Sequence, residues 1–415
     1  MLRKIVGAVS IYLGLPKDIY FIAFARFLLG LGNFIIPFLV LLLTQKLGYS
    51  TTVAGGLAMG VTGLYLFGTL IGGKLADSFG HKRVMVLGEL AGALILIICG
   101  FFSDSHFIAP ALLFVSYFFF GVSFPASSAL VADLSTPKNR DAVMSLSYLA
   151  YNLGSGIGPV LAGYLFWSHT VWIYWGNGIA AFIGILVVMF WVREPKHSAT
   201  DEHTEQPELE KATDGSVWQV LRQRPRLIIF TLLCTLLWFA LYQMTMTTPL
   251  YLSHIFDKQG AVLFGQLMTF ASILVVLITP LLMRLTNQQC EMKSLAVSGL
   301  LFAFGYWVIL INTTIPMQFI AWIFLSAAEV LLVTKEGVYI ANQSPSSHRG
   351  RISGILTTIR NLAVMPTYVL MGAQIQQFGY QSTWTMIIVT SFIAALLLWA
   401  LSLQQSKKQD VALAS

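Results

Sequence analysis

Six ionisable side chains lie inside long apolar stretches of the sequence, where a charge is costly. They are Arg26, Glu89, Glu329, Lys335, Glu336 and Arg360. Charged groups in such surroundings commonly bind a ligand, carry a proton or pair with one another. Glu329 lies about halfway along its stretch, so it is the best candidate for a proton carrier. The alternative is a fixed ion pair with one of the basic residues of this set.

The other charges in this set leave several readings open. Glu336 follows Glu329 by seven residues, close to two helical turns, so both acids share a helix face and Glu336 is a second proton-coupling candidate. Lys335 and Glu336 are close enough to the end of their stretch to snorkel, and so is Glu89. Arg26 and Arg360 would either neutralise these acids or bind an anionic substrate.

Aromatic and amide side chains form a second group of candidate binding residues. Such side chains suit apolar and cationic ligands through stacking and cation–π contacts, although packing and lipid contact are the alternative. The group comprises Trp238, Tyr242 and Gln243 in one stretch and Tyr117, Tyr151 and Asn152 in two others.

The composition identifies the elements that must position these residues. Of 415 residues, 56% are hydrophobic and only 10% are charged, whereas soluble proteins carry about 25% charge. This excludes a disordered chain, a nucleic-acid-binding protein and a disulfide-stapled secreted fold, and it leaves a helical membrane protein. The three cysteines have no metal-binding spacing, and no catalytic constellation is evident, so we expect neither a metal site nor an enzyme.

Twelve stretches are long and apolar enough to cross a bilayer as helices. Of the 25 Lys and Arg residues, 20 lie in loops on the N-terminal side of the membrane and two on the other side, so we expect both termini in the cytoplasm. The expected spans are 18–45, 52–74, 84–103, 107–133, 142–167, 171–193, 226–254, 260–283, 294–312, 316–341, 353–376 and 381–404.

The chain reads as two related halves. A polar linker, 194–225, separates a six-helix bundle at 1–193 from a second bundle and short tail at 226–415. Arg140 precedes Asn152 by twelve residues, and Arg349 precedes Asn361 by the same interval. This repeat predicts two pseudo-symmetric bundles around a central site, an architecture of secondary transporters.

The loop after the second span carries a recognisable motif. Residues 73–83 read GKLADSFGHKR, which resembles the signature of the major facilitator superfamily. The resemblance implies the all-α major facilitator fold and a conformational latch on the inner side. In that latch Gly73 and Gly80 permit close approach and a turn, Asp77 faces the start of span eleven, and Arg83 pairs with Asp133. We also take Asp133 as a proton-coupling candidate.

The fifth span adds a second motif. Residues 154–163 read GSGIGPVLAG, which resembles the antiporter motif of drug/proton exporters and adds Gly158 and Pro159 to the conformational residues. Generic small-residue packing is the alternative. Glu329 resembles the acid that a subset of multidrug exporters carries in span ten. Tyr117 stands where many members of the family have an arginine.

Together these features predict a secondary transporter of the inner (plasma) membrane that works by alternating access. We expect it to export amphipathic or cationic compounds in exchange for protons. The alternatives are a proton-coupled importer of peptides or other small solutes and a translocator of lipids or lipid-linked solutes. The predicted partners are a small-molecule substrate, protons and the lipid bilayer, without nucleic acid or cofactor; the proton gradient is the energy source and a monomer the expected state.

Overall fold

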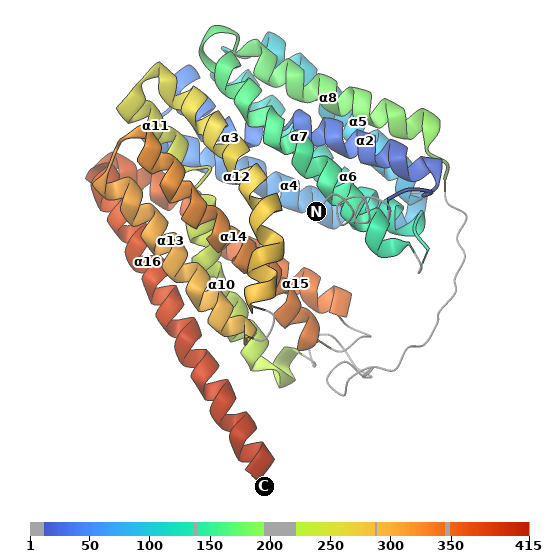
Figure 1. Ribbon diagram of the computed structural model, residues 1–415. Coiled ribbons are helices and arrows are strands. Elements are labelled where there is room, and N and C mark those ends of the chain that lie inside the picture. Colours follow the sequence, from blue (N-terminus) through green and yellow to red (C-terminus); the bar gives the residue numbers. More distant parts are fainter. Residues whose placement is uncertain (1–11, 137–138, 195–220, 287–288, 345–348, 415) are drawn as a thin grey trace. The chain divides into compact units, whose positions relative to one another are not determined.

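The structure, a computed structural model, describes residues 12–136, 139–194, 221–286, 289–344 and 349–414. These ranges consist of helices joined by short turns and contain no strand (Figure 1). Most of the predicted linker lies outside them. The elements are α2 (Lys17–Leu31), α3 (Ile35–Leu41), the π-helical η1 (Leu42–Lys46), α4 (Thr51–Phe79), α5 (His81–Phe101), α6 (Ile108–Asp133), α7 (Arg140–Ser168), α8 (Val171–Trp191), α10 (Pro225–Tyr242), α11 (Thr247–Phe256), α12 (Lys258–Thr286), α13 (Glu291–Ile311), α14 (Ile315–Asn342), α15 (Arg349–Val364) and α16 (Thr367–Ala414).

The described helices account for the twelve predicted spans. Ten segments are long and apolar enough to cross a membrane. One of them, Ile352–Gln404, divides at Gly379, whose φ of 73° interrupts the helix. The 29-residue α7 supplies the remaining span, although its polar residues make it less hydrophobic than the ten. The all-helical fold is therefore confirmed, and the cytoplasmic position of the termini stays a prediction.

The chain forms two compact units, each described here by itself. Unit 1 comprises Met1–Thr200 with Leu252–Ser272, and unit 2 comprises Asp201–Tyr251 with Ile273–Ser415. The predicted division at the linker places 252–272 in the second bundle, whereas this segment groups with unit 1. Glycine explains part of this grouping, because a Cβ on Gly265 of α12 would lie 2.3 Å from the carbonyl oxygen of Pro159 in α7.

Helix packing within each unit follows a simple pattern. In unit 1, α6 packs on α4 and α5, α8 packs on α5 and α2, and α2 packs on α7. Buried side chains such as Ile22, Leu130 and Val188 join α2, α6 and α8 in one core. In unit 2, α13 packs on α14 and α16, and α10 packs on α15 and α16. Each unit thereby surrounds its in-span charges with helices.

The first span of each predicted half is a broken helix. Residues 32–34 interrupt the first, and residues 243–246 interrupt the second. The backbone at the second break is held by Gln243, whose carbonyl oxygen accepts from the Thr247 and Thr248 amides. At the first break Asn177 accepts from the Ile35 amide through Oδ1. The breaks expose backbone groups that polar side chains must satisfy.

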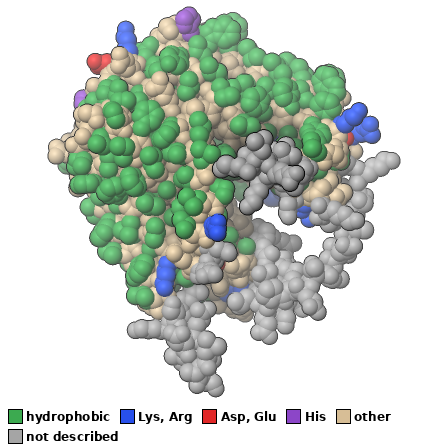
Figure 2. Space-filling view, in the orientation of Figure 1, with side chains coloured by type: hydrophobic (Ala, Val, Ile, Leu, Met, Phe, Trp, Pro, Cys, Tyr) green, Lys and Arg blue, Asp and Glu red, His purple; other side chains and the backbone are tan. Residues whose placement is uncertain are grey.

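Hydrophobic side chains cover much of the visible surface (Figure 2). Large apolar residues stand largely exposed, such as Phe107 just before α6, Leu277 on α12 and Phe190 on α8. A soluble monomer rarely exposes extended apolar surface. Helices of this length and surface character fit a lipid environment.

Candidate functional site

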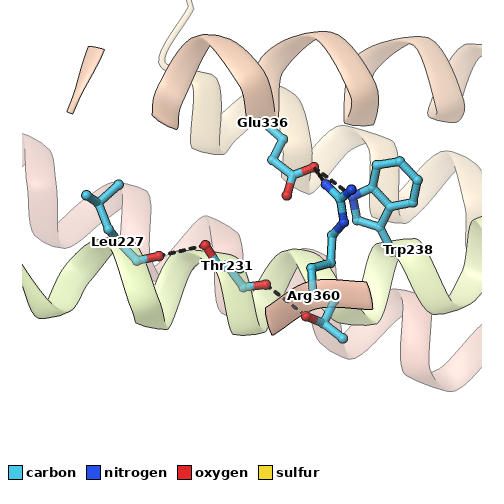
Figure 3. Close-up of polar contacts among 6 residues, drawn as sticks. Leu227, Thr231, Trp238, Glu336 and Arg360 are labelled. Carbon is cyan, nitrogen blue, oxygen red and sulfur yellow. Dashed lines mark hydrogen bonds and ion pairs between the residues drawn. The ribbon is translucent and has the colours of Figure 1, made fainter. Parts of the chain in front are cut away.

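A closed group of charged and aromatic side chains lies inside unit 2. Glu336 on α14 accepts two hydrogen bonds at Oε2, from Arg360 of α15 at 2.9 Å and from Nε1 of Trp238 on α10 at 2.7 Å. The Arg360 guanidinium carbon lies 3.9 Å from the centre of the Trp238 ring. Figure 3 shows the carboxylate pointing toward both partners. The salt bridge makes this group electrically neutral, and the cation–π contact adds an attraction between Arg360 and Trp238.

The burial of this group shows that Lys335 and Glu336 do not snorkel, and its contacts show which role Arg360 takes. Glu336 is 3% exposed, and Lys335 is 7% exposed, so neither snorkels to a surface. Lys335 instead donates from Nζ to the carbonyl oxygen of Thr286, the last residue of α12, at 2.9 Å. A cation at a helix C-terminus satisfies an open carbonyl and complements the helix dipole. Arg360 neutralises Glu336, one of the two roles that its sequence position left open.

Glu329 differs from its neighbour on α14. It is half-buried at the middle of the helix. No described residue gives it a hydrogen bond or a salt bridge, although Tyr306 on α13 is close enough to interact electrostatically. The expected alternative for Glu329, a fixed pair with Lys335 or Arg360, is not formed within unit 2, because those cations bind Thr286 and Glu336.

The neighbouring candidates of α10 have different surroundings. Tyr242 is half-buried, and its ring centroid lies 6.1 Å from that of Trp238. Gln243 is fully buried: its Nε2 donates to the Phe239 carbonyl and its Oε1 accepts from the Thr247 hydroxyl. The structure thus uses Gln243 at the helix break and does not bring its amide to the Glu336 group.

Unit 1 holds a second charged group. Arg26 on α2 is half-buried, and no described residue gives it a hydrogen bond or salt bridge; its Nε atom is fully buried without a partner. Its charge interacts with Glu89 of α5 and with Tyr65 and Tyr151 of α4 and α7. Ser123 of α6 also belongs to this region, because it donates a hydrogen bond to Glu89. Five helices, α2, α4, α5, α6 and α7, therefore contribute to it.

Glu89 is the residue that sequence reasoning undervalued. It does not snorkel: it is 6% exposed and accepts a hydrogen bond from Oγ of Ser123 at 2.6 Å. The expected span began at residue 84, but Gly80, with φ of 93°, lets α5 begin directly at His81. Glu89 therefore lies more than two turns inside the helix. The glycine before His81 was the sequence signal that could have moved this boundary.

Of the remaining binding candidates of unit 1, only Tyr151 is shown to interact with Arg26; Tyr117 and Asn152 make other contacts. Tyr117 is 7% exposed and packs against Phe120. Tyr151 is 37% exposed and joins the electrostatic group of Arg26. Asn152 donates from its side chain to the carbonyl oxygen of Tyr148 in its own helix, at 2.8 Å.

The predicted latch has different partners in the structure. Oδ2 of Asp133 lies 2.5 Å from Nδ1 of His81, and Arg83 lies 3.9 Å from Glu194. The expected Arg83–Asp133 pair is therefore corrected. His81 opens α5, and its side chain reaches the last residue of α6, whereas exposed Arg83 extends toward the chain after α8.

Other latch residues differ in their packing. Gly80 supplies the positive φ that an L side chain rarely adopts, so its position in the motif has a backbone reason. Asp77 is exposed on α4, and a Cβ on Gly73 would meet no atom within 4 Å. The role of Asp77 at span eleven stays a prediction.

The small residues of the fifth span mediate close helix contacts. A Cβ on Gly154 would lie 2.1 Å from the carbonyl oxygen of Phe27, and one on Gly158 would lie 2.6 Å from that of Leu31. Both contacts join α7 to α2. On another side of α7, the Pro159 carbonyl meets Gly265 of α12. Within unit 1 this motif lets two helices approach α7 closely.

The in-span carboxylates are the groups of this arrangement that can bind a proton or a cation. Within the described ranges, no three His, Cys, Asp or Glu side chains gather to hold a metal ion. What the units supply is one compensated carboxylate, Glu336, and two carboxylates without a salt bridge in the described structure, Glu89 and Glu329. Such acids in apolar helices suit reversible binding of a proton or a cation.

Comparison with known proteins identifies the fold. The family model described as Major Facilitator Superfamily matches residues 22–292 and 290–414. The POT family transporter PepTSo superposes with a TM-score of 0.76 at 15% identity, covering 95% of this chain and 99% of that structure. At this identity the likeness concerns the fold alone.

Two relatives share more of the sequence. A Na(+), Li(+), K(+)/H(+) antiporter of Planococcus maritimus is 24% identical over 392 residues, covering 86% of this chain and 88% of the relative. Multidrug resistance protein MdtH of Salmonella typhimurium is 31% identical over 152 residues, 35% of this chain and 36% of the relative. Together with the family match along almost the whole chain, these findings show that the protein is a multi-pass membrane transporter belonging to the major facilitator superfamily.

Proposed function

We propose that this transporter exports amphipathic or cationic compounds in exchange for protons by alternating access. The observation that carries the proposal is Glu329, a carboxylate at the middle of α14 without a hydrogen bond or salt bridge from the described residues. A carboxylate that no fixed cation compensates is available to a proton or to a cationic substrate. Because the two compete for one site, binding of one releases the other.

The contrast with Glu336 supports this assignment. Glu336 has its charge compensated by Arg360 and its Oε2 bonded to Trp238. It is therefore a poorer exchange site than Glu329, although both were proton-coupling candidates. The named activities of two relatives, a cation/proton antiporter and a multidrug resistance protein, are of the same chemical type.

The driving force for exchange depends on how much net charge crosses the membrane with each proton. Each elementary charge that moves down 100 mV contributes about 2.3 kcal/mol. Exchange of one proton for a neutral compound moves one charge, whereas exchange of one proton for a monovalent cation is electrically silent and uses the pH gradient alone. The response to potential and to the pH gradient therefore reports the charge that accompanies each proton.

The test uses inverted membrane vesicles that contain the protein. Energised vesicles with wild-type protein should accumulate a cationic dye such as ethidium and consume part of the pH gradient. Glu329→Gln should abolish both effects, and Glu329→Asp should retain part of each. Asp104→Asn, which alters an exposed acid after α5, is the matched control and should behave as wild type. Dye-driven proton movement that survives Glu329→Gln would contradict the proposal.

A second candidate is proton-coupled import of peptides or other anionic solutes. The observation in its favour is Arg26, a half-buried cation without a hydrogen-bond or salt-bridge partner among the described residues. A substrate carboxylate would supply that partner. Addition of a dipeptide to one side of proteoliposomes would acidify the lumen under this function, whereas a cationic dye would have no effect.

Placement in the membrane completes the proposal. We place the protein in the plasma membrane as a monomer, with both termini in the cytoplasm, on the basis of the Lys and Arg distribution. Single cysteines at positions 17 and 258, in a chain without its three native cysteines, should label from opposite sides of the membrane. Labelling of both from the same side would contradict this topology.

A further inference from the structure

Glu89 of unit 1 is a buried acid that the proposed exchange at Glu329 does not use. It is 6% exposed on α5, and Ser123 of α6, its hydrogen-bond partner, is 2% exposed. A carboxylate in such a position without a salt bridge is costly, and membrane proteins retain such groups mainly where they function. The geometry around Ser123 shows what this group can do.

The Ser123 hydroxyl lies near two acceptors but has a single proton to donate. Its Oγ is 2.6 Å from Oε2 of Glu89 and 2.9 Å from the carbonyl oxygen of Phe120. If Glu89 is ionised, the hydroxyl donates to the carboxylate. If Glu89 is protonated, its own O–H donates to Ser123, whose hydroxyl then donates to Phe120. Either state is hydrogen-bonded, and the change requires rotation of one hydroxyl.

The helices around Glu89 contribute few charged or titratable groups. Among the described residues, Arg26 of α2 is the one cation that interacts with it, and Tyr65 of α4 and Tyr151 of α7 are the neighbouring phenols. On α6 the facing group is Ser123. The helix α8, which also packs on α5, carries no charged residue. Protonation of Glu89 therefore changes the net charge of this group by one unit beside Arg26.

We propose that Glu89 is a second proton-binding site of the transporter, that Ser123 is the hydrogen-bond switch which stabilises both of its states, and that Arg26 senses the change. With Glu89 ionised, its charge offsets that of Arg26, and the group is neutral. With Glu89 protonated, Arg26 leaves the group with a charge of +1, which disfavours a cationic substrate in unit 1. This assignment rests on the proposed proton-coupled exchange and extends it to the first unit.

Two transport modes in proteoliposomes separate coupling from binding. Counterflow exchanges labelled for unlabelled substrate without net proton movement, whereas accumulation against a gradient needs the proton. Glu89→Gln keeps the volume and mimics the protonated acid, so counterflow of a neutral amphipathic substrate, which the +1 charge of the group does not repel, should stay within about twofold of wild type. Accumulation of this neutral substrate driven by the proton gradient should fall about tenfold or more, because one proton at 100 mV sustains about a 50-fold gradient of a neutral compound.

Three further variants make the outcome specific. Glu89→Asp keeps a carboxyl group and should restore part of the accumulation. Ser123→Ala removes the switch and should change the pH at which accumulation is half-maximal, with counterflow intact. Asp104→Asn alters an exposed acid in the turn after α5 and should have no effect. Equal loss of counterflow and accumulation in both Glu89→Gln and Ser123→Ala would indicate a merely structural role and overturn the proposal.

A readout independent of transport distinguishes failure of this inference from failure of the proposed function. Infrared difference spectra of the purified protein between acidic and alkaline pH should contain a carboxylic C=O band that Glu89→Gln removes and Glu329→Gln retains. If wild type moves no dye with protons but this band is present, the proposed substrate exchange fails and the Glu89 site stands. If the band is unchanged in Glu89→Gln, the proton site is overturned whatever the transport result.

Discussion

The charged groups of the two units contain the same residue types and differ in how their charges are satisfied. In unit 2, Arg360 binds Glu336 at 2.9 Å and lies over the Trp238 ring. In unit 1, Arg26 and Glu89 interact electrostatically without a salt bridge, and Glu89 accepts a hydrogen bond from Ser123. Unit 2 therefore holds an ion pair in addition to the uncompensated Glu329, whereas unit 1 holds two charges without a salt bridge among the described residues.

We propose that this difference separates structural from functional charges in the same apolar surroundings. A buried ion pair resists a change in protonation, because loss of either charge leaves the other unpaired. An acid with a hydroxyl partner changes protonation without that loss. Position within a span is thus a weaker guide to function than the identity of the hydrogen-bond partner.

The largest effect is expected from breaking the closed pair of unit 2. Arg360→Met leaves the Glu336 carboxylate buried without its cation and should destabilise the protein by about 3–5 kcal/mol. The midpoint of thermal unfolding in detergent measures this. The double variant with Glu336→Gln should recover much of the loss. Arg222→Met, at an exposed position, is the control. An equally small change in the unfolding midpoint of both arginine variants would show that the Arg360–Glu336 pair does not stabilise the fold.

Helix packing in unit 1 gives the next largest effect. Gly154→Ala places a methyl group 2.1 Å from the Phe27 carbonyl, so α7 and α2 must separate, at a cost of about 1–3 kcal/mol. Gly337→Ala on α14 of unit 2 meets no atom within 4 Å and should be neutral or slightly stabilising through helix propensity. Unfolding midpoints of the two variants, measured together, test this contrast.

Removal of the open charge of unit 1 should affect transport more than stability. Arg26→Gln breaks no hydrogen bond or salt bridge within the described structure, so its unfolding free energy should change by less than about 1 kcal/mol. Proton-driven accumulation should fall about tenfold, equivalent to about 1.4 kcal/mol, because the charge beside Glu89 is lost. Arg26→Lys keeps the charge and should retain much of the activity. Normal accumulation in Arg26→Gln would show that the charge of Arg26 is not needed for transport.

The smallest effects are expected at the surface pairs of unit 1. Arg83→Gln loses a contact of 3.9 Å between exposed side chains and should change stability by less than about 0.5 kcal/mol. His81→Ala loses the shorter pair with Asp133 and should cost about 0.5–1 kcal/mol. Thermal unfolding at low salt compares the two. A larger loss of stability from Arg83→Gln than from His81→Ala would favour the Arg83–Asp133 pair that the sequence motif predicted.

Much of the fold followed from the sequence. Apolar stretches of about 20 residues must span as helices in a bilayer, because the backbone finds no other hydrogen-bond partners there. The twelve helical spans were predicted correctly, with boundaries that shifted by a few residues, whereas the conformational role of the glycine-rich motifs stays a prediction. For the site, the sequence identified which ionisable residues lie in the spans, including Glu329, Glu336 and Arg360.

Sequence alone determined the membrane character, the helices and the inventory of in-span charges, since these depend on composition and on short-range periodicity. Only the tertiary structure decided which charges are compensated. Glu336 and Arg360 are 24 residues apart and Trp238 lies 98 residues from Glu336, whereas Glu89 meets Ser123 across 34 residues. Partners at such separations are chosen by the rotation and packing of whole helices. The same type of acid in an apolar span is therefore salt-bridged at Glu336 in one unit and hydrogen-bonded, without a salt bridge among the described residues, at Glu89 in the other.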